Sequence, residues 1–124
     1  RLNQNLTTLK LDKKVIKDWG YEVWLANNEK ENYCGKILFI NEGKSTSMHF
    51  HVNKHESFYI LEGELCIHIL NTETTESKPH YVKAGQKFIM DRYIPHKLEA
   101  NGGPVKFIEI STFHEDSDSY RVWK

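Results

Sequence analysis

Two histidines separated by a single residue form the first pattern in this sequence that could do chemistry. His49 and His51 lie in the run MHFH at residues 48–51. On a strand, alternate side chains point to the same face, so these two imidazoles would lie about 6.6–7 Å apart along it, with Phe50 turned away. Two imidazoles placed in this way can bind one metal ion if they face a cavity.

One carboxylate and one further imidazole could complete a ligand set. Glu56 follows His51 after the turn at residues 52–55, and it begins the next apolar segment. An antiparallel return would place Glu56 opposite the histidine pair, and His96 begins another short segment further along. Three imidazoles and one carboxylate suit Zn, Mn, Fe, Co or Ni and leave coordination positions open for water or substrate.

Short strands separated by turns are the elements that must hold these residues. No segment shows sustained helical periodicity, and many short strands at this spacing indicate an all-β sandwich or barrel. Residues 1–17 are expected to form an N-terminal arm or strand. The turn at residues 62–64 predicts a hairpin, and residues 71–79 read as a polar loop. The expected strands span residues 33–40, 57–61, 65–70, 86–90, 96–100 and 105–111.

The composition bounds the class of protein. A chain of 124 residues suits one domain, 1–124. Lys plus Arg and Asp plus Glu both number 17, so the zero formal charge gives no indication of nucleic acid or a membrane as partner. No apolar run approaches the roughly 20 residues of a membrane span. Cys34 and Cys66 fall in apolar runs and are expected to be buried free thiols, which favours the cytoplasm.

The spacing of the candidate ligands resembles the first motif of the cupin superfamily. Gly43, five residues, His49-x-His51, four residues, Glu56, six residues and Gly63 match that motif at every position. The resemblance implies a jelly-roll β-barrel of the cupin type. It also implies that the two histidines and the glutamate, together with His96, are the ligands of one divalent metal ion.

The second cupin motif fits less completely. Gly85 and His96 are in register with it. Asp91 and Tyr93 stand where the family has Pro and Gly, and Ala100 stands where it has Asn. The shape of the turn before His96 is therefore expected to differ from the family pattern, while the ligand itself is retained.

Two flanking segments resemble the type II phosphomannose isomerase domain, a sugar-phosphate isomerase of the cupin class. They are the run WGYE at residues 19–22 and the run from IEIS at 108–111 through the acidic stretch to Arg121. The resemblance implies a metal-dependent isomerase or epimerase that acts on a sugar or sugar phosphate. Such a reaction needs a base near the substrate and cations that pair the phosphate. The candidate bases are Glu109, Tyr59 and His55, and the candidate phosphate-binding residues are Arg92, Lys97 and Arg121.

Two other functions remain open at this point. Three histidines and one glutamate could equally hold Fe(II) in an oxygen-using enzyme, and a domain this short could be a non-catalytic module that binds a sugar.

A homodimer is expected, with the segment around residues 19–25 pairing across a two-fold axis, because open barrels have edge strands. His80 and His114 lie in polar segments and are expected to be solvated, whereas the face of His68 is not decided.

Overall fold

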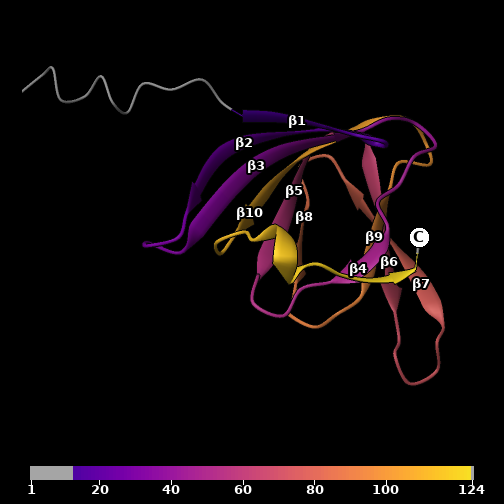
Figure 1. The fold of residues 1–124 in the computed structure, drawn as a ribbon. Coiled ribbons are helices and arrows are strands. Elements are labelled where there is room, and N and C mark those ends of the chain that lie inside the picture. The colour runs from indigo at the N-terminus through magenta and orange to yellow at the C-terminus, as the bar shows by residue number, and fades with distance from the viewer. Residues whose placement is uncertain (1–12, 124) are drawn as a thin grey trace, which may run out of the picture.

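The computed structural model describes residues 13–123, and nearly all of their regular structure is strand (Figure 1). All of the strands expected from the sequence are present, with ends shifted by a residue at most. The strands are β1 (Lys13–Lys17), β2 (Gly20–Asn28), β3 (Tyr33–Ile40), β4 (Met48–Phe50), β5 (Glu56–Glu62), β6 (Glu64–Leu70), β7 (Ser77–Lys83), β8 (Lys87–Met90), β9 (His96–Glu99), β10 (Val105–Ser111) and β11 (Tyr120–Trp123), with the 3-10 helix η2 (Asp116–Asp118) before the last.

The described strands form two antiparallel sheets that face each other. The first has the order β1-β2-β3-β10-β5-β8, and the second has the order β11-β4-β9-β6-β7. Strands that are distant in sequence are neighbours in both sheets, as in a jelly roll (Figure 1). The expected all-β jelly-roll architecture is therefore confirmed.

The apolar core lies between the two sheets. Strand alternation places every second side chain inward, so that on β5 the residues Glu56, Phe58 and Ile60 are buried while Tyr59 faces outward. From the second sheet, Leu65 and Ile67 of β6 join the same core. The face that carries the candidate ligand Glu56 is thus continuous with the core, and this fixes the orientation of its side chain.

The hairpin expected around residues 62–64 is not formed. β5 pairs with β10 and β8, whereas β6 pairs with β7 and β9, so the turn at Gly63 carries the chain from one sheet to the other. Gly63 has φ of 84°, and a Cβ there would lie 2.4 Å from the carbonyl oxygen of Pro104. A sequence that suits a tight turn cannot show whether the strands on either side share a sheet.

Two further segments differ from expectation. Residues 71–79 were expected to be a loop, but β7 begins at Ser77 and pairs along the whole of β6, so only residues 71–76 connect the two strands. β11 was not expected, and it pairs with β4 at the edge of the second sheet. β7 is mostly exposed and polar, and β11 is short and exposed along its whole length, so neither shows the alternation of apolar and polar residues by which strands are recognised.

The N-terminal strands extend the first sheet. Residues 1–12 of the expected arm lie outside the described residues, and Lys13–Lys17 forms β1. β2 lies between β1 and β3, so the segment expected to pair with a second copy already has a neighbour on each side within its own chain. Gly20 allows this packing, because a Cβ there would lie 1.8 Å from the carbonyl oxygen of Phe39. No helix in residues 13–123 is long and apolar enough to cross a membrane.

Candidate metal centre and its cavity

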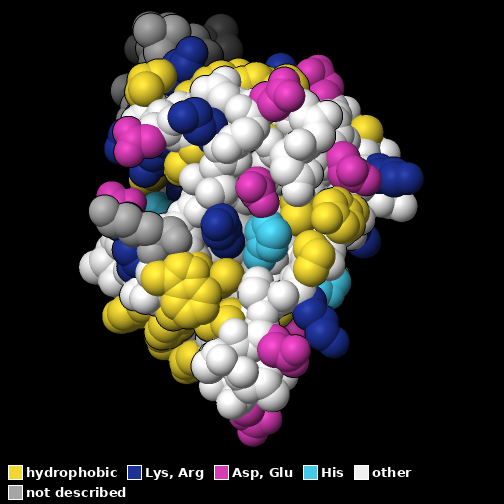
Figure 2. Space-filling view, turned by 90° about the vertical axis from the view of Figure 1, so that its right-hand side faces the viewer, with side chains coloured by type: hydrophobic (Ala, Val, Ile, Leu, Met, Phe, Trp, Pro, Cys, Tyr) yellow, Lys and Arg dark blue, Asp and Glu magenta, His cyan; other side chains and the backbone are white. Residues whose placement is uncertain are grey.

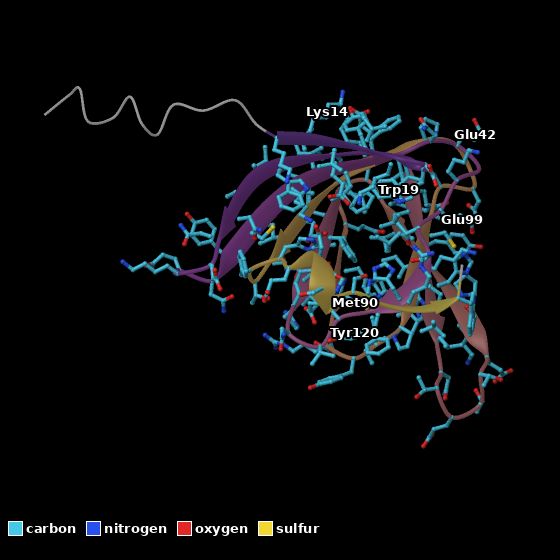
Figure 3. The ribbon with its side chains drawn as sticks, in the orientation of Figure 1. Lys14, Trp19, Glu42, Met90, Glu99 and Tyr120 are labelled. Atoms are coloured by element: carbon cyan, nitrogen blue, oxygen red, sulfur yellow. The ribbon has the colours of Figure 1, made fainter. Side chains whose placement is uncertain are left out.

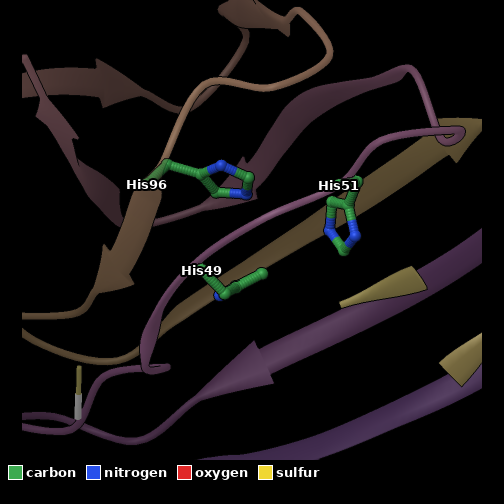
Figure 4. A group of neighbouring side chains, drawn as sticks. All are labelled: His49, His51 and His96. Carbon is green, nitrogen blue, oxygen red and sulfur yellow. The ribbon is translucent and has the colours of Figure 1, made fainter. Parts of the chain in front are cut away.

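Three imidazoles converge between the sheets. His49 lies on β4 and His51 directly follows it, while His96 begins β9 in register with His49. The ring centroids are 4.7 Å apart for His49 and His96, 5.1 Å for His49 and His51, and 5.8 Å for His51 and His96. One nitrogen from each ring lies within 4.8 Å of the other two. Figure 4 shows the three side chains, which come from two different segments of the chain. Phe50, between the two histidines, stacks instead on Tyr120.

Backbone hydrogen bonds fix the tautomer of all three rings. A carbonyl oxygen can only accept, so the nitrogen facing it must carry the proton. The other nitrogen, Nε2, then keeps its lone pair, as a metal-binding imidazole requires. The Nδ1 atoms face the carbonyl oxygens of Ser47 for His49 (2.8 Å), Asp118 for His51 (2.7 Å) and Ile94 for His96 (2.9 Å).

Burial keeps His49 and His51 neutral. Burial and the neighbouring His96 lower the pKa of His49 to about 3. Burial likewise lowers the pKa of His51. A neutral imidazole is the form that binds a metal ion, so these rings are ready to do so without first losing a proton.

Glu56 supplies a carboxylate oxygen to the same point. Its Oε2 lies 3.2 Å from Nε2 of His96 and 3.5 Å from Nε2 of His51. Burial would raise the pKa of Glu56, but its neighbours, the charge of Lys54 first among them, hold the pKa well below its usual range. Among residues 13–123, neither Oε2 of Glu56 nor Nε2 of His96 has a hydrogen-bond partner, although both atoms are buried. Buried atoms left unpaired are costly, and a cation bound between them would satisfy both.

Lys54 is a buried residue of this site that sequence reasoning missed. Its ammonium group has three N–H bonds and faces three acceptors: Oε2 of Glu109 at 3.0 Å, Nδ1 of His114 at 3.0 Å and Oε1 of Glu56 at 3.4 Å. Burial would lower its pKa, but the two carboxylates outweigh burial and raise it, so Lys54 stays charged. The sequence placed Lys54 in a polar turn, where lysines are usually solvated.

His114 extends this cluster toward solvent. Its Nε2 lies 2.8 Å from Oδ1 of the exposed Asp116, and its Nδ1 faces Lys54. Burial, Lys54 and Lys36 lower its pKa. The expectation that His114 is solvated is therefore wrong. The loop after β10 folds over the cavity, and the imidazole ring of His114 lines that cavity.

A cavity of about 770 Å³ opens from the candidate metal centre, and its lining includes the three histidines, Glu56 and Trp19. Cationic side chains also line it. Lys36 is fully buried, 3.5 Å from Oε1 of Glu22 and 4.2 Å from the centroid of the Trp24 ring. Arg121 is in register with His49 on the neighbouring strand. Lys17 and Arg121 lie at more exposed positions of the lining.

The structure brings only two of the six candidate catalytic and substrate-binding residues to this cavity. Glu109 lines it from β10 and accepts hydrogen bonds from Lys54 and Ser111, and Arg121 lines it from β11. The other four lie elsewhere. Tyr59 faces outward on β5, His55 binds Asp91 at 2.9 Å, Arg92 binds the carbonyl of Asn53, and Lys97 lies on the face of β9 opposite to His96.

The family is decided by a match that spans more than half of the chain. The family model described as Cupin domain matches residues 37–111, the stretch that holds all four candidate ligands. The chain belongs to the cupin family. A search of the curated proteins found no match.

Solved structures confirm the cupin fold. The capsular polysaccharide assembling protein CapF from Staphylococcus aureus is 17% identical with a TM-score of 0.77, over 94% of this chain and 35% of that chain. Oxalate decarboxylase from Bacillus subtilis is 16% identical with a TM-score of 0.75, over 90% and 30%. The Lactobacillus farciminis enzyme, in its formate complex, is 16% identical with a TM-score of 0.74, over 90% and 34%. This cupin chain thus spans about a third of the length of these proteins.

Proposed function

We propose that His49, His51, Glu56 and His96 bind one divalent metal ion, and that the cavity beside it takes a sugar or sugar phosphate on which this cupin acts as an isomerase. The observation that carries the metal site is the pair of buried, unpartnered atoms, Oε2 of Glu56 and Nε2 of His96, facing each other at 3.2 Å. Zn, Mn, Fe, Co and Ni all suit the donor set.

The charges around the cavity favour an anionic, oxygen-rich ligand. A bound divalent ion would polarise the carbonyl and hydroxyl oxygens of such a substrate. Arg121, on the strand beside His49, can pair a phosphate through its guanidinium fork. Lys36 adds a buried positive charge to the wall. The likeness in fold to a capsular polysaccharide assembling protein is consistent with a carbohydrate ligand.

Glu109 is the candidate base that the geometry favours. It is buried, lines the cavity and is held by Lys54 at 3.0 Å and Ser111 at 3.3 Å, both through Oε2. Its carboxylate can accept a proton from the carbon beside the substrate carbonyl and return it to the neighbouring carbon. Lys54 acts as a positioning residue, because it fixes the orientation of Glu109 and of Glu56 together.

The test is proton exchange in heavy water with metal-loaded protein and a panel of hexose and pentose phosphates. Exchange at the carbon beside the carbonyl that disappears in Glu109→Gln supports the isomerase. Arg121→Gln should raise KM for phosphorylated substrates, and Arg92→Gln, outside the cavity, is the matched control. Ligand binding without exchange would favour a non-catalytic sugar-binding module. Oxygen consumption by the Fe(II) form, without exchange, would favour an oxygenase.

The sheet edge and the cysteines also suggest an oligomeric state and a cellular compartment. We infer a homodimer, in which the exposed strand β1 meets a second copy, because β1 is an edge strand among residues 13–123 and sheet edges are normally covered. Light scattering should give twice the chain mass of 14.6 kDa, and a monomer at tens of micromolar would contradict it. Cys34 and Cys66 are both buried and free, as expected, and this is consistent with the cytoplasm.

A further inference from the structure

We propose a second metal site on the outer face of the five-stranded sheet, formed by Cys66, His68 and Glu99 and suited to Zn²⁺. Strand alternation separates this site from the first. On β6, Leu65 and Ile67 belong to the core, so Cys66 and His68 lie on the opposite face.

Strand β9 carries a ligand of each site on its two faces. His96 and Leu98 point inward, whereas Glu99 points outward, directly across from Cys66 in the β6–β9 register. Figure 3 labels Glu99 on the side of the molecule where β6 and β7 lie, and Figure 2, which views that side, shows histidine, acidic and basic side chains at the surface.

Three different donor atoms meet at one point. Nε2 of His68 lies 2.6 Å from Oε1 of Glu99 and 3.5 Å from Sγ of Cys66. All three donors lie within 4.8 Å of one another. Thiolate, imidazole and carboxylate are the three ligand types of protein zinc sites.

The arrangement does not suit a nucleophile with its base. A cysteine–histidine–glutamate relay uses both ring nitrogens, one toward the sulfur and the other toward the carboxylate. Here the same atom, Nε2 of His68, faces both groups. One nitrogen cannot donate to Glu99 and also accept the thiol proton of Cys66, whereas one cation can lie between all three donors.

The distances fit a tetrahedral ion with little movement. Zn–S of about 2.3 Å and Zn–N of about 2.0–2.1 Å at a tetrahedral angle place sulfur and nitrogen about 3.5 Å apart, and Cys66 and His68 have that separation already. Glu99 would have to retreat by about 0.8 Å from His68 to reach the corresponding oxygen–nitrogen separation. Its side chain is 27% exposed and that of His68 is 24% exposed, so both can adjust, and water can take the fourth position.

The surroundings of the sulfur bear on its deprotonation. Burial and the charge of Glu99 raise the pKa of Cys66, while hydrogen bonds from the side chains of Tyr81 and Asn101 act in the opposite direction. A metal-bound cysteine loses its proton, so those two groups would stabilise the bound thiolate.

Cobalt absorption distinguishes the two sites, because the first contains no sulfur. The full chain is titrated with Co²⁺, and the near-ultraviolet charge-transfer band of a cobalt thiolate is recorded. We expect the band in the native chain and in His49→Ala, which disrupts only the first site. It should be lost in Cys66→Ala, retained in the matched control Cys34→Ala, and quenched when Zn²⁺ is added.

His68→Gln provides an independent variant, because its partly exposed side chain can change without opening the core. It should weaken Co²⁺ binding at the thiolate at least about tenfold, as loss of a ligand does. Absence of the band in the native chain would overturn the proposal. So would a band that survives in His68→Gln at full strength, or one that depends on Cys34 instead of Cys66.

Discussion

Nδ1 of His51 donates a hydrogen bond of 2.7 Å to the backbone carbonyl of Asp118. The side chain of Asp118 in turn accepts from the backbone N–H groups of Val52, Asn53 and Lys54 at 2.9–3.2 Å. The C-terminal segment thereby holds the turn that follows the histidine pair, and it orients one of the candidate metal ligands. The site depends on a residue 67 positions away from that ligand.

Replacement of Asp118 by Ala should weaken both the fold and the metal site. The N–H groups of the turn lose their acceptor, and we expect a loss of about 1–3 kcal/mol in the free energy of unfolding. The carbonyl that accepts from His51 remains in this variant, but the segment that carries it is no longer anchored to the turn, so metal affinity should fall about 10–100-fold. Denaturant unfolding and metal titration measure the two effects. Glu115→Ala, an exposed neighbour without a capping role, is the control and should change neither.

Lys54→Ala should be strongly destabilising. It leaves the buried carboxylates of Glu56 and Glu109 without their shared cation, and breaking a buried ion pair costs about 3–5 kcal/mol. Denaturant unfolding measures the loss, and Lys44→Ala provides an exposed lysine for comparison. The double variant Lys54→Met with Glu109→Gln removes one of the orphaned charges and should recover part of the stability. Equal stability of Lys54→Ala and the native chain would show that the cluster is not formed.

His114 should titrate below the ordinary histidine range. Burial and the charges of Lys54 and Lys36 lower its pKa, while its hydrogen bond to Asp116 raises it. The folded state therefore binds this proton less readily than the unfolded state, so this contribution to stability is lost as pH falls below about 6.5 toward the folded pKa. Imidazole NMR signals followed against pH measure the value. Asp116→Asn should lower it further, and a native value at or above 6.5 would contradict the cluster.

Gly63→Ala should destabilise the protein by more than about 1 kcal/mol, because its φ of 84° and the 2.4 Å approach of the Pro104 oxygen both exclude a Cβ. Gly102→Ala is the matched control, since nothing lies within 4 Å of a Cβ there. Thermal unfolding of the two variants gives the comparison. Similar losses in both would mean that the crossover at Gly63 is less tightly packed than described.

The part of the site that sequence reasoning could reach follows from local spacing. Strand alternation is sufficient to place His49 and His51 on one face, and to separate Glu56, Phe58 and Ile60 from Tyr59. The apolar strands were found for the same reason. Which strands share a sheet depends on the path of the chain after each turn, and for that reason the turn at Gly63 was misread as a hairpin.

The rest of the site is built from contacts across long stretches of sequence. Lys54 lies in a polar turn, and two of its three acceptors, Glu109 and His114, follow it by 55 and 60 residues. His114 and Asp118 lie in an acidic segment that reads as a solvated loop, yet one reaches Lys54 and the other caps the turn at residues 52–54. Cys66 and His68 are two residues apart on β6, but their third partner, Glu99, comes from another strand.

The most direct measurement of the central claim is metal content in a Cys66→Ala background, in which the proposed outer site cannot contribute a thiolate. The protein is loaded separately with Zn²⁺, Mn²⁺, Fe²⁺, Co²⁺ and Ni²⁺, desalted and analysed for metal. We predict about one ion per chain with at least one of these cations, and its loss when His96→Ala is added, since that variant removes one of four converging ligands. No bound metal with any cation, or an unchanged metal content in His96→Ala, would contradict the account.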